Sequence, residues 1–344
     1  MEKYNSKCNN CGSELWFNPK QGCLTCRYCE SNYILPKKKE KAVLVRQYDA
    51  GFHPNQFNQM ISAYRCDTCG NIYYMSSQEK SKKCSNCGNS SCSVVQDAGY
   101  CADGIIPFRI GKEEASKELV KFLNSKKGIP KELKNLALNQ KIMGVFVPVW
   151  NFSFNVSAEY AGNATELKKD SAGWYYGVSK PIFGDEMKRV PSLDESATTN
   201  ETNDFLELFD ENDYAGIIPY IPEYTYGYRV DAINKDIHDY YYEITNRAEN
   251  EMKRRIRRNL NSKYKELRDL NIYAKAEDVF FNFTYVPVFI NTYTYRGKTY
   301  KTYISGTTGK VAGKTPVSIK RLFGRIFKTI GVLAVLGLIG YLLI

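Results

Sequence analysis

The chain has 344 residues and a formal net charge of +11, with 27 Tyr and 17 Phe. Such a length usually exceeds one hydrophobic core, so we expect two or three domains, and the many aromatic residues favour β-structure. The charge is +5 over residues 1–100, +1 over 101–313 and +5 over 314–344. A nearly neutral middle argues against a large nucleic-acid surface there. The first residues contain no apolar run, so no secretion signal is expected.

Four Cys-x-x-Cys pairs lie in the first quarter of the chain. Fourteen residues separate the two pairs of each set, and the second set repeats the first after 58 residues. Each set can supply four thiolates to one tetrahedral zinc, so the spacing predicts two Zn²⁺ ions. Disulfides or redox pairs are the alternative, but eleven cysteines are an odd number and the pairs are closely spaced. The predicted ligands are Cys8, Cys11, Cys26 and Cys29 for one ion and Cys66, Cys69, Cys84 and Cys87 for the other.

The first zinc ribbon is expected over residues 1–35. Two short strands, Leu15–Phe17 and Cys23–Thr25, are predicted on either side of a turn at Asn18–Gly22. The ribbon therefore has the antiparallel form that places two cysteine pairs close together.

Three residues of this ribbon need a separate interpretation. Gly12 follows the first pair and can adopt the positive φ of a tight turn, whereas Glu30 stands where the second pair would have a glycine. Cys23 also forms a Cys-x-x-Cys pair with Cys26. The equal spacing in the second set favours Cys26 with Cys29, which leaves Cys23 as a strand residue.

Residues 36–63 are expected to form a linker, because the charged run Lys37–Lys41 is typical of a solvated segment. The second zinc ribbon follows over residues 64–92, with a strand at Ile72–Met75. Cys92 and Cys101 lie outside the repeated spacing. Cys92 could replace a ligand, but we interpret both as bystanders.

The middle of the chain contains repeated motifs, which predict a duplicated body. Gly104–Phe108 recurs as Gly216–Tyr220, and Val147–Trp150 recurs as Val286–Phe289. A helical pattern lies between the two motifs of each copy, and alternating strands follow the second motif. The proline inside each Val-Pro-Val suggests a strand start or a sheet edge.

Each copy is therefore predicted as an α+β unit, a helix followed by antiparallel sheet. The units span residues 100–190 and 214–313, and the acidic, polar span 191–213 between them is expected to be a mobile linker. The first helix is predicted at Lys112–Leu123 and a second short one around Leu133–Ala137, in unit 1. Unit 2 carries one long helical pattern over roughly Lys235–Leu270. Its strands are predicted around the turn Arg296–Lys298.

The C-terminal segment 322–344 is predicted to be one transmembrane helix, a tail anchor. Its last 16 residues, Thr329–Ile344, carry no charge, and the two basic residues before them can reach the lipid headgroups. A buried C-terminal helix is the alternative. Basic residues flank the segment on one side, which predicts a single-pass protein of the cell membrane with its N-terminal body in the cytoplasm.

No catalytic constellation accompanies these elements, so we expect a protein that is not an enzyme, although an activity of the Tyr-rich body stays open. Only two histidines occur, His53 and His238, and a zinc ion with four cysteine ligands has no open coordination position. The basic run Lys253–Arg258 is either the solvated face of a helix or a contact with anionic lipid or nucleic acid.

The chain resembles the tail-anchored bacterial membrane proteins labelled transcription-factor-IIB-type zinc-ribbon proteins. The likeness rests on the paired ribbons and the apolar tail, together with four motifs: Ile106–Phe108, Gly144–Trp150, Gly297–Tyr300 and Ser305–Gly313. This resemblance implies an adaptor that works with SPFH-domain (flotillin-like) and phage-shock-type proteins in envelope stress. Glu30 and the short tail depart from the family pattern.

Two functions are therefore expected from the sequence. The first is a membrane-anchored zinc-ribbon adaptor that recruits or scaffolds a cytosolic protein partner, with an SPFH-domain protein as the partner that the resemblance implies. The alternative is a nucleic-acid-binding zinc-ribbon protein tethered to the membrane, which the basic ribbons and the Lys253–Arg258 run would favour.

Overall fold

The computed structural model describes residues 7–35, 43, 45–49, 62–68, 72–75, 91–95, 102–126, 129, 132, 134–135, 142–233 and 235–315. It is a mixed α/β protein with a cluster of four cysteines near its N-terminus. Two sheets are present in these residues, one of three strands and one of twelve. The strands are β1 (Leu15–Asn18), β2 (Cys23–Cys26), β3 (Asn32–Tyr33), β4 (Arg46–Gln47), β5 (Ser62–Cys66), β6 (Ile72–Met75), β7 (Cys92–Val95), β8 (Gly104–Ile105), β9 (Met143–Lys169), β10 (Tyr175–Ser196), β11 (Ile218–Pro219), β12 (Arg229–Asp231), β13 (Glu266–Tyr295), β14 (Lys298–Ser305) and β15 (Val311–Gly313). The helices are α1 (Lys112–Ser125), α3 (Glu211–Tyr214), α4 (Tyr241–Lys263) and the 3-10 turns η2 (Asn203–Leu208), η3 (Pro222–Thr225) and η4 (Ile237–Asp239).

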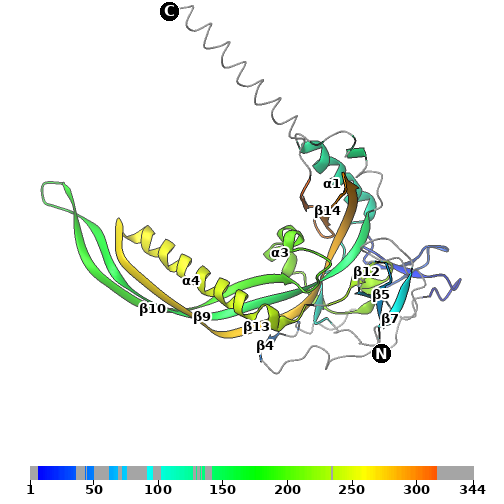
Figure 1. Ribbon diagram of the computed structural model, residues 1–344, viewed down its shortest axis with the longest axis horizontal. Helices are drawn as coiled ribbons and strands as arrows, with labels where there is room; N and C mark the ends of the chain where they lie inside the picture. Colours follow the sequence, from blue (N-terminus) through cyan, green and yellow to red (C-terminus); the bar gives the residue numbers. More distant parts are fainter. Residues whose placement is uncertain are drawn as a thin grey trace, which may run out of the picture.

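Two long antiparallel strands, β9 and β13, form the centre of the large sheet (Figure 1). Val147 pairs with Val286, so the two repeated Val-Pro-Val motifs lie directly opposite each other. The repeated Gly-Ile-Ile-Pro motifs also meet, because β8 pairs with β11. The strands of the two predicted units therefore belong to one continuous sheet.

The two halves of this sheet have similar neighbours. Along one edge of β9, the parallel strand β12 pairs with Val145 and Phe146, and the antiparallel strand β10 pairs with β9 from Val149 onward. On β13, β8 and then β14 occupy the corresponding places. The change of neighbour occurs at Pro148 and at Pro287.

The prolines are therefore neither at the start of a strand nor at a sheet edge, the two positions that the sequence suggested, but inside two long central strands. Pro148 O accepts a hydrogen bond from Ala197 N–H (2.9 Å), and Pro287 O accepts one from Gly306 N–H (2.8 Å). Each proline nitrogen lies where one neighbouring strand has ended, so its missing N–H removes no bond from a regular ladder.

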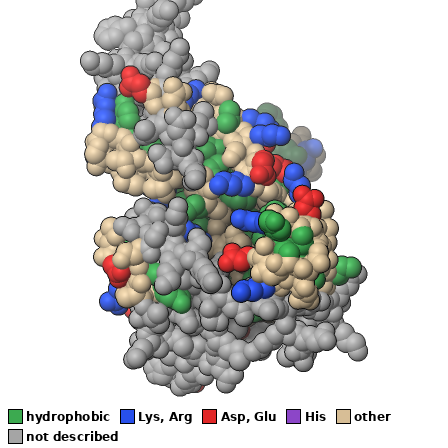
Figure 2. Space-filling view, turned by 90° about the vertical axis from the view of Figure 1, so that its right-hand side faces the viewer, with side chains coloured by type: hydrophobic (Ala, Val, Ile, Leu, Met, Phe, Trp, Pro, Cys, Tyr) green, Lys and Arg blue, Asp and Glu red, His purple; other side chains and the backbone are tan. Residues whose placement is uncertain are grey.

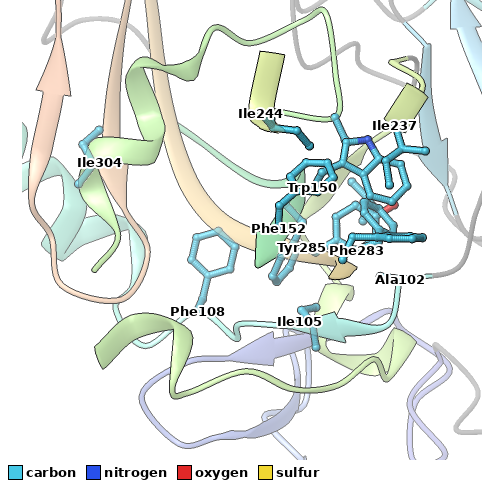
Figure 3. Close-up of a cluster of buried hydrophobic side chains, with 14 of the residues drawn as sticks. Ala102, Ile105, Phe108, Trp150, Phe152, Ile237, Ile244, Phe283, Tyr285 and Ile304 are labelled. Atoms are coloured by element: carbon cyan, nitrogen blue, oxygen red, sulfur yellow. The ribbon is translucent and has the colours of Figure 1, made fainter. Parts of the chain in front are cut away.

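Buried side chains cover both faces of the central strands. One face carries large aromatic residues, among them Trp150 and Tyr285, and Phe108 from the loop after β8 belongs to the same buried cluster (Figure 3). Trp150 is fully buried, and its indole N–H donates to Lys235 O (3.2 Å). Continuous burial on two faces explains why the central segments are apolar at almost every position, rather than at alternate ones.

The opposite face is covered by residues 203–214, and all of them except Tyr214 belong to the predicted mobile linker 191–213. Phe205 and Leu208 pack there against Val147 and Val286, so the linker prediction is wrong for this segment. Its polar composition misled the prediction, because buried polar residues pair with each other. Glu201 is almost fully buried and lies 2.9 Å from Lys301 Nζ.

The sequence pattern predicted the bounds of α1 better than those of α4. Helix α1 begins at Lys112, as predicted, and buries Ala115, Leu119 and Leu123. Helix α4 is shorter than the predicted 235–270, since it spans Tyr241–Lys263 and β13 begins at Glu266. The apolar residues after Tyr264 face the core from a strand, and their spacing happened to continue the helical period.

Beyond the centre, β10, β9 and β13 continue as a curved three-stranded arm, with α4 lying along its concave side (Figure 1). Buried and exposed residues alternate along β9 in this region, as predicted: Phe152, Phe154 and Val156 are buried. One face of the arm is thus covered by α4, and the other faces solvent.

Two further segments predicted to lie apart from the body join its sheet. Strand β4, inside the predicted linker 36–63, pairs with Phe280 and Phe281 of β13. Strand β6 of the predicted second ribbon pairs with β12. The body therefore holds both segments by backbone hydrogen bonds.

In the part of the chain that the structure describes, no helix combines the length and the apolar character that a membrane span requires. The predicted anchor 322–344 lies outside the described residues. Of the short helix predicted around Leu133–Ala137, Lys134 and Asn135 are helical, and the other residues are likewise not described.

Candidate metal centre

Four cysteine side chains converge at one end of the N-terminal ribbon (residues 7–35). The Sγ atoms of Cys8, Cys11, Cys26 and Cys29 all lie within 4.8 Å of one another. Cys8 Sγ is 3.4 Å from Cys29 Sγ, and Cys11 Sγ is 3.5 Å from Cys26 Sγ. Four thiolates around a metal at about 2.3 Å would lie at similar separations. The group could therefore hold a metal ion with four sulfur ligands.

The two cysteine pairs are presented by turns of the same form. Gly12 N–H donates to Cys8 O (2.8 Å), and Glu30 N–H donates to Cys26 O (3.1 Å). The strands between the turns pair antiparallel, with Leu15 opposite Cys26. The predicted strands and turn of this ribbon are confirmed, and they bring the two halves of the ligand set together.

Hydrogen bonds prepare two of the thiols for metal binding. The Tyr33 hydroxyl lies 3.2 Å from Cys8 Sγ and lowers the pKa of that thiol. The Ser31 hydroxyl lies 3.1 Å from Cys29 Sγ, and together with the Ser31 N–H it lowers the pKa of Cys29 to about 6. Thiolates are the form that binds metals. Sequence reasoning missed Tyr33, since nothing in the cysteine spacing points to a tyrosine four residues after the last ligand.

Cys26 behaves differently, because it is fully buried. The Cys29 N–H is the largest influence and lowers its pKa, but burial and the thiols of Cys11 and Cys29 raise the pKa to about 11 overall. Four neighbouring thiolates repel one another without a cation, so a bound metal would favour the fully deprotonated cluster.

Glu30 occupies a position that glycine would fill more easily. Its φ is 56°, in the left-handed region, and Gly12 at the equivalent turn has φ 73°. We expect Glu30→Gly to stabilise the metal-bound ribbon by about 1 kcal/mol, because it removes the left-handed strain of a residue with a Cβ. In a competition with a chelator, this corresponds to roughly a fivefold lower Kd of the ribbon for its metal.

Gly12→Ala is the matched control for this prediction. No atom lies within 4 Å of an added Cβ at Gly12, so the substitution introduces backbone strain alone. Metal retention should fall in Gly12→Ala and rise in Glu30→Gly. A fall in both variants would mean that the Glu30 side chain itself supports the site.

The N-terminal ribbon is docked on the body. Phe17 N–H donates to Tyr226 O (2.9 Å), and the Phe17 ring meets the Tyr224 ring edge-on, with centroids 4.9 Å apart. Trp16 packs closely against Gly227, where an added Cβ would lie 2.7 Å from Trp16 Cβ. The cysteine cluster is thus held in a defined orientation relative to the large sheet.

A hollow of about 1190 Å³ lies between this ribbon and the body. Figure 2 shows this side of the molecule, with Lys and Arg side chains among those around the hollow. Cys26, Tyr228 and Phe289 contribute to its walls. Its charged lining residues are Lys20, Arg27, Lys112, Arg229, Glu30 and Glu113. The hollow is therefore more basic than acidic, and aromatic side chains are among those that line it.

The second predicted ligand set is described in part. Cys66 ends β5, is buried, and pairs in register with Cys92 of β7. Cys69, Cys84 and Cys87 lie outside the described residues, as does Cys101. A second metal site remains a prediction, and the register places Cys92 next to the one described member of this set.

His238 packs with aromatic residues of the body. Its Nδ1 lies 2.6 Å from the Tyr48 hydroxyl, and the Tyr48 ring also stacks on Tyr241. His53 lies outside the described residues.

Comparison with known proteins found a relative in Bacillus subtilis (strain 168). The chain is 24% identical to the uncharacterized protein YdjG over 327 residues, which cover 91% of this chain and 90% of the relative. No family model matches the chain. No solved structure matches it either.

Proposed function

We propose that the protein is a membrane-anchored zinc-ribbon adaptor that recruits or scaffolds cytosolic partner proteins at the cytoplasmic membrane. The observation that supports this most is the four-cysteine cluster of the ribbon docked on the body. Four thiolates fill a tetrahedral site and leave no position for substrate or water. A metal bound there would fix a surface rather than perform a reaction.

Zinc is the metal that suits this site best. Four sulfur ligands in a tetrahedral arrangement are typical of structural zinc, although iron can also take such a set. We propose Cys66, Cys69, Cys84 and Cys87 as the ligands of a second zinc ion. The spacing of the second set supports this proposal, since it equals that of the first.

The duplicated body would act as the scaffold. The Val-Pro-Val motifs pair with each other, and each lies where a short parallel strand gives way to a long antiparallel one. This internal similarity supports an origin by duplication. The hollow beside the N-terminal ribbon is the surface that we assign to a partner, because both basic and aromatic side chains line it.

Residues 322–344 would anchor the body to the membrane, and the basic residues before them would keep it in the cytoplasm. The resemblance to tail-anchored zinc-ribbon proteins suggests the class of partner, an SPFH-domain protein that acts in the envelope-stress response.

Deleting Leu322–Ile344 tests this proposal. We expect the protein to move completely from the membrane fraction to the soluble fraction, because the deleted segment buries a long run of Ile, Leu and Val in lipid. An SPFH-domain partner labelled with a fluorescent protein should then disperse. An unrelated transmembrane segment placed after residue 321 should restore both. A truncated chain that still sediments with membranes would contradict the anchor, and a partner that stays at the membrane would contradict recruitment.

A second candidate function is nucleic-acid binding, which one feature of α4 favours. From Met252 to Lys263 this helix has six basic residues and no acidic one. Titration of DNA or RNA binding with salt separates the two functions, since tight binding that weakens steeply with salt would favour the nucleic-acid reading.

A further inference from the structure

The arm ends in a hairpin whose large side chains are exposed. β9 and β10 continue as two strands beyond the first residue of β13, because Glu266 pairs with Thr165 and the hairpin turns at residues 170–174. Trp174 is 76% exposed, Tyr175 67%, Tyr176 50% and Leu167 46%. Such a group of exposed aromatic and aliphatic residues, which we call the arm tip (residues 167–176), marks an interaction site more often than a single exposed residue does.

Basic residues lie in and beside the arm tip, which also contains the exposed Asp170. Lys168 and Lys169 are exposed, and Lys169 Nζ lies 5.6 Å from the centre of the Tyr175 ring. The C-terminal end of α4 lies beside it, because Lys265 N–H donates to Thr165 O (2.9 Å). The six basic residues between Met252 and Lys263 therefore lie on the helix half that leads to the tip.

These basic side chains lie on the surface of α4 that faces away from the core. Met252, Ile256 and Leu260 face the sheet and are buried, and four arginines on other faces are exposed: Arg254, Arg255, Arg257 and Arg258. Among the ion pairs of the described residues, Glu251 is the acidic partner of both Arg254 and Arg258. One carboxylate against this cluster leaves an excess of positive charge on the exposed side of the helix, which we call the basic face of α4.

The shape of the body places these features on one side. In Figure 1 the sheet curves like an arc, with the arm tip at one end and β14 at the other, and both ends bend toward the side on which α4 lies. β15 pairs with β14, and the described chain ends two residues later at Thr315. The arm tip, the basic face of α4 and the last described residue, Thr315, thus share one side of the molecule.

We propose that the arm tip and the basic face of α4 form a second membrane contact, which binds the surface of an anionic bilayer. Trp and Tyr side chains favour the headgroup region, since they combine an apolar ring with a polar group, and Leu167 adds aliphatic area. Lys and Arg beside them attract acidic lipid headgroups. This contact rests on the proposed membrane anchor for its location, and it would bring the end of the arm, with side chains from both faces of the hairpin, to the bilayer beside the basic face of α4.

A bilayer explains the combination of groups better than a nucleic acid does. Phosphate backbones would account for the basic face of α4, and bases could stack on the aromatic rings. Leu167 and two lysines beside one apolar tip fit an interface between water and hydrocarbon, where both kinds of side chain are accommodated at once.

Tryptophan fluorescence of the full-length protein tests this proposal, because the three tryptophans differ in environment. Trp150 is buried and Trp16 lies beneath Arg27, whereas Trp174 is exposed at the arm tip. The protein is reconstituted into vesicles of phosphatidylcholine alone or with phosphatidylglycerol, with brominated acyl chains as quenchers. We expect quenching that is at least threefold stronger with phosphatidylglycerol, and that is absent in Trp174→Phe.

Charge variants give the matched comparison. Lys168→Glu with Lys169→Glu, and separately Arg254→Glu with Arg257→Glu, should each reduce the lipid quenching of Trp174 by threefold or more. Lys275→Glu, an exposed residue of β13 on the face of the arm that α4 does not cover, should leave it unchanged. Because all these residues are exposed, circular dichroism should show the same fold for every variant.

Three results would overturn the proposal. Trp174 could be quenched by aqueous acrylamide equally with and without phosphatidylglycerol, or show no quenching by brominated lipid. It could also be protected by single-stranded RNA and not by vesicles, which would assign the surface to nucleic acid. Flotation of the same vesicles reports the tail anchor separately: wild-type protein that fails to float would contradict the anchor, while the Trp174 signal after addition of anionic vesicles still reports the arm tip.

Discussion

Cys26→Ser is expected to remove one metal ion per chain and to unfold the N-terminal ribbon. Cys26 is fully buried between the two cysteine turns, and its Sγ accepts hydrogen bonds from Tyr28 N–H and Cys29 N–H. A serine hydroxyl cannot replace the thiolate, and three ligands bind far more weakly than four. Metal binding supplies on the order of 10 kcal/mol to the folding of such small modules. Elemental analysis of the purified chain would show the loss, and limited proteolysis would cut within residues 7–35.

Cys23→Ser is the matched control in the same strand. Cys23 is buried near Gln21 and Thr25 and lies outside the cluster of four. Its substitution should leave the metal content unchanged, as the predicted ligand assignment requires. Loss of metal in Cys23→Ser, together with retention in Cys26→Ser, would reverse the choice between these two cysteines.

Trp150→Ala is expected to destabilise the body by about 3–5 kcal/mol, because it opens a large cavity in a tightly packed core. The indole is fully buried, packs against Phe281 and Phe283, and donates a hydrogen bond to Lys235 O (3.2 Å). It therefore joins β9, β13 and the segment that leads into α4. Urea denaturation of the detergent-solubilised protein would show a lower midpoint.

Trp174→Ala is the matched control, because it removes the same side chain from an exposed position. It should change the free energy of unfolding by no more than about 0.5 kcal/mol. Equal effects of the two substitutions would mean that Trp150 does not contribute to the core as its burial indicates.

Local features of the fold could be predicted well from the sequence. The antiparallel strands of the N-terminal ribbon, helix α1 from Lys112 and the alternating burial around Phe154 follow from short-range rules. The hairpin of β13 and β14 was predicted around a turn at Arg296–Lys298; in the structure Lys298 pairs with Tyr295, and the turn is Arg296 and Gly297, both with positive φ. Each of these depends only on residues close in the chain.

Features that depend on long-range pairing could not be predicted. Nothing in the repeated Val-Pro-Val motifs shows that they pair with each other, and composition alone made residues 191–213 resemble a solvated linker. The polar side chains there are satisfied by distant partners, as when Tyr303 donates to Glu201 (2.7 Å). The end of α4 was also hidden, because Leu267 continues the helical spacing while β9 offers it a strand partner.

For the candidate site, spacing identified the four cysteines of the ribbon but not their surroundings. Tyr33 lowers the pKa of Cys8, a residue 25 positions away that it reaches only in the folded ribbon, whereas Ser31 lowers the pKa of Cys29 from two positions away. The docking of the ribbon through Phe17 likewise depends on residues 224–226, two hundred positions away. A cysteine pattern thus predicts a metal centre without showing what holds it in place.

X-ray absorption at the zinc edge of the intact protein tests most directly whether the metal centre is closed. A structural site of the kind described here predicts a single shell of four sulfur atoms at about 2.3 Å from zinc. It also predicts no oxygen or nitrogen ligand, because Cys8, Cys11, Cys26 and Cys29 fill all four positions. An absorption spectrum that requires a light-atom ligand at about 2.0 Å would show an open coordination position, and would contradict the account of this centre as a fixed binding platform.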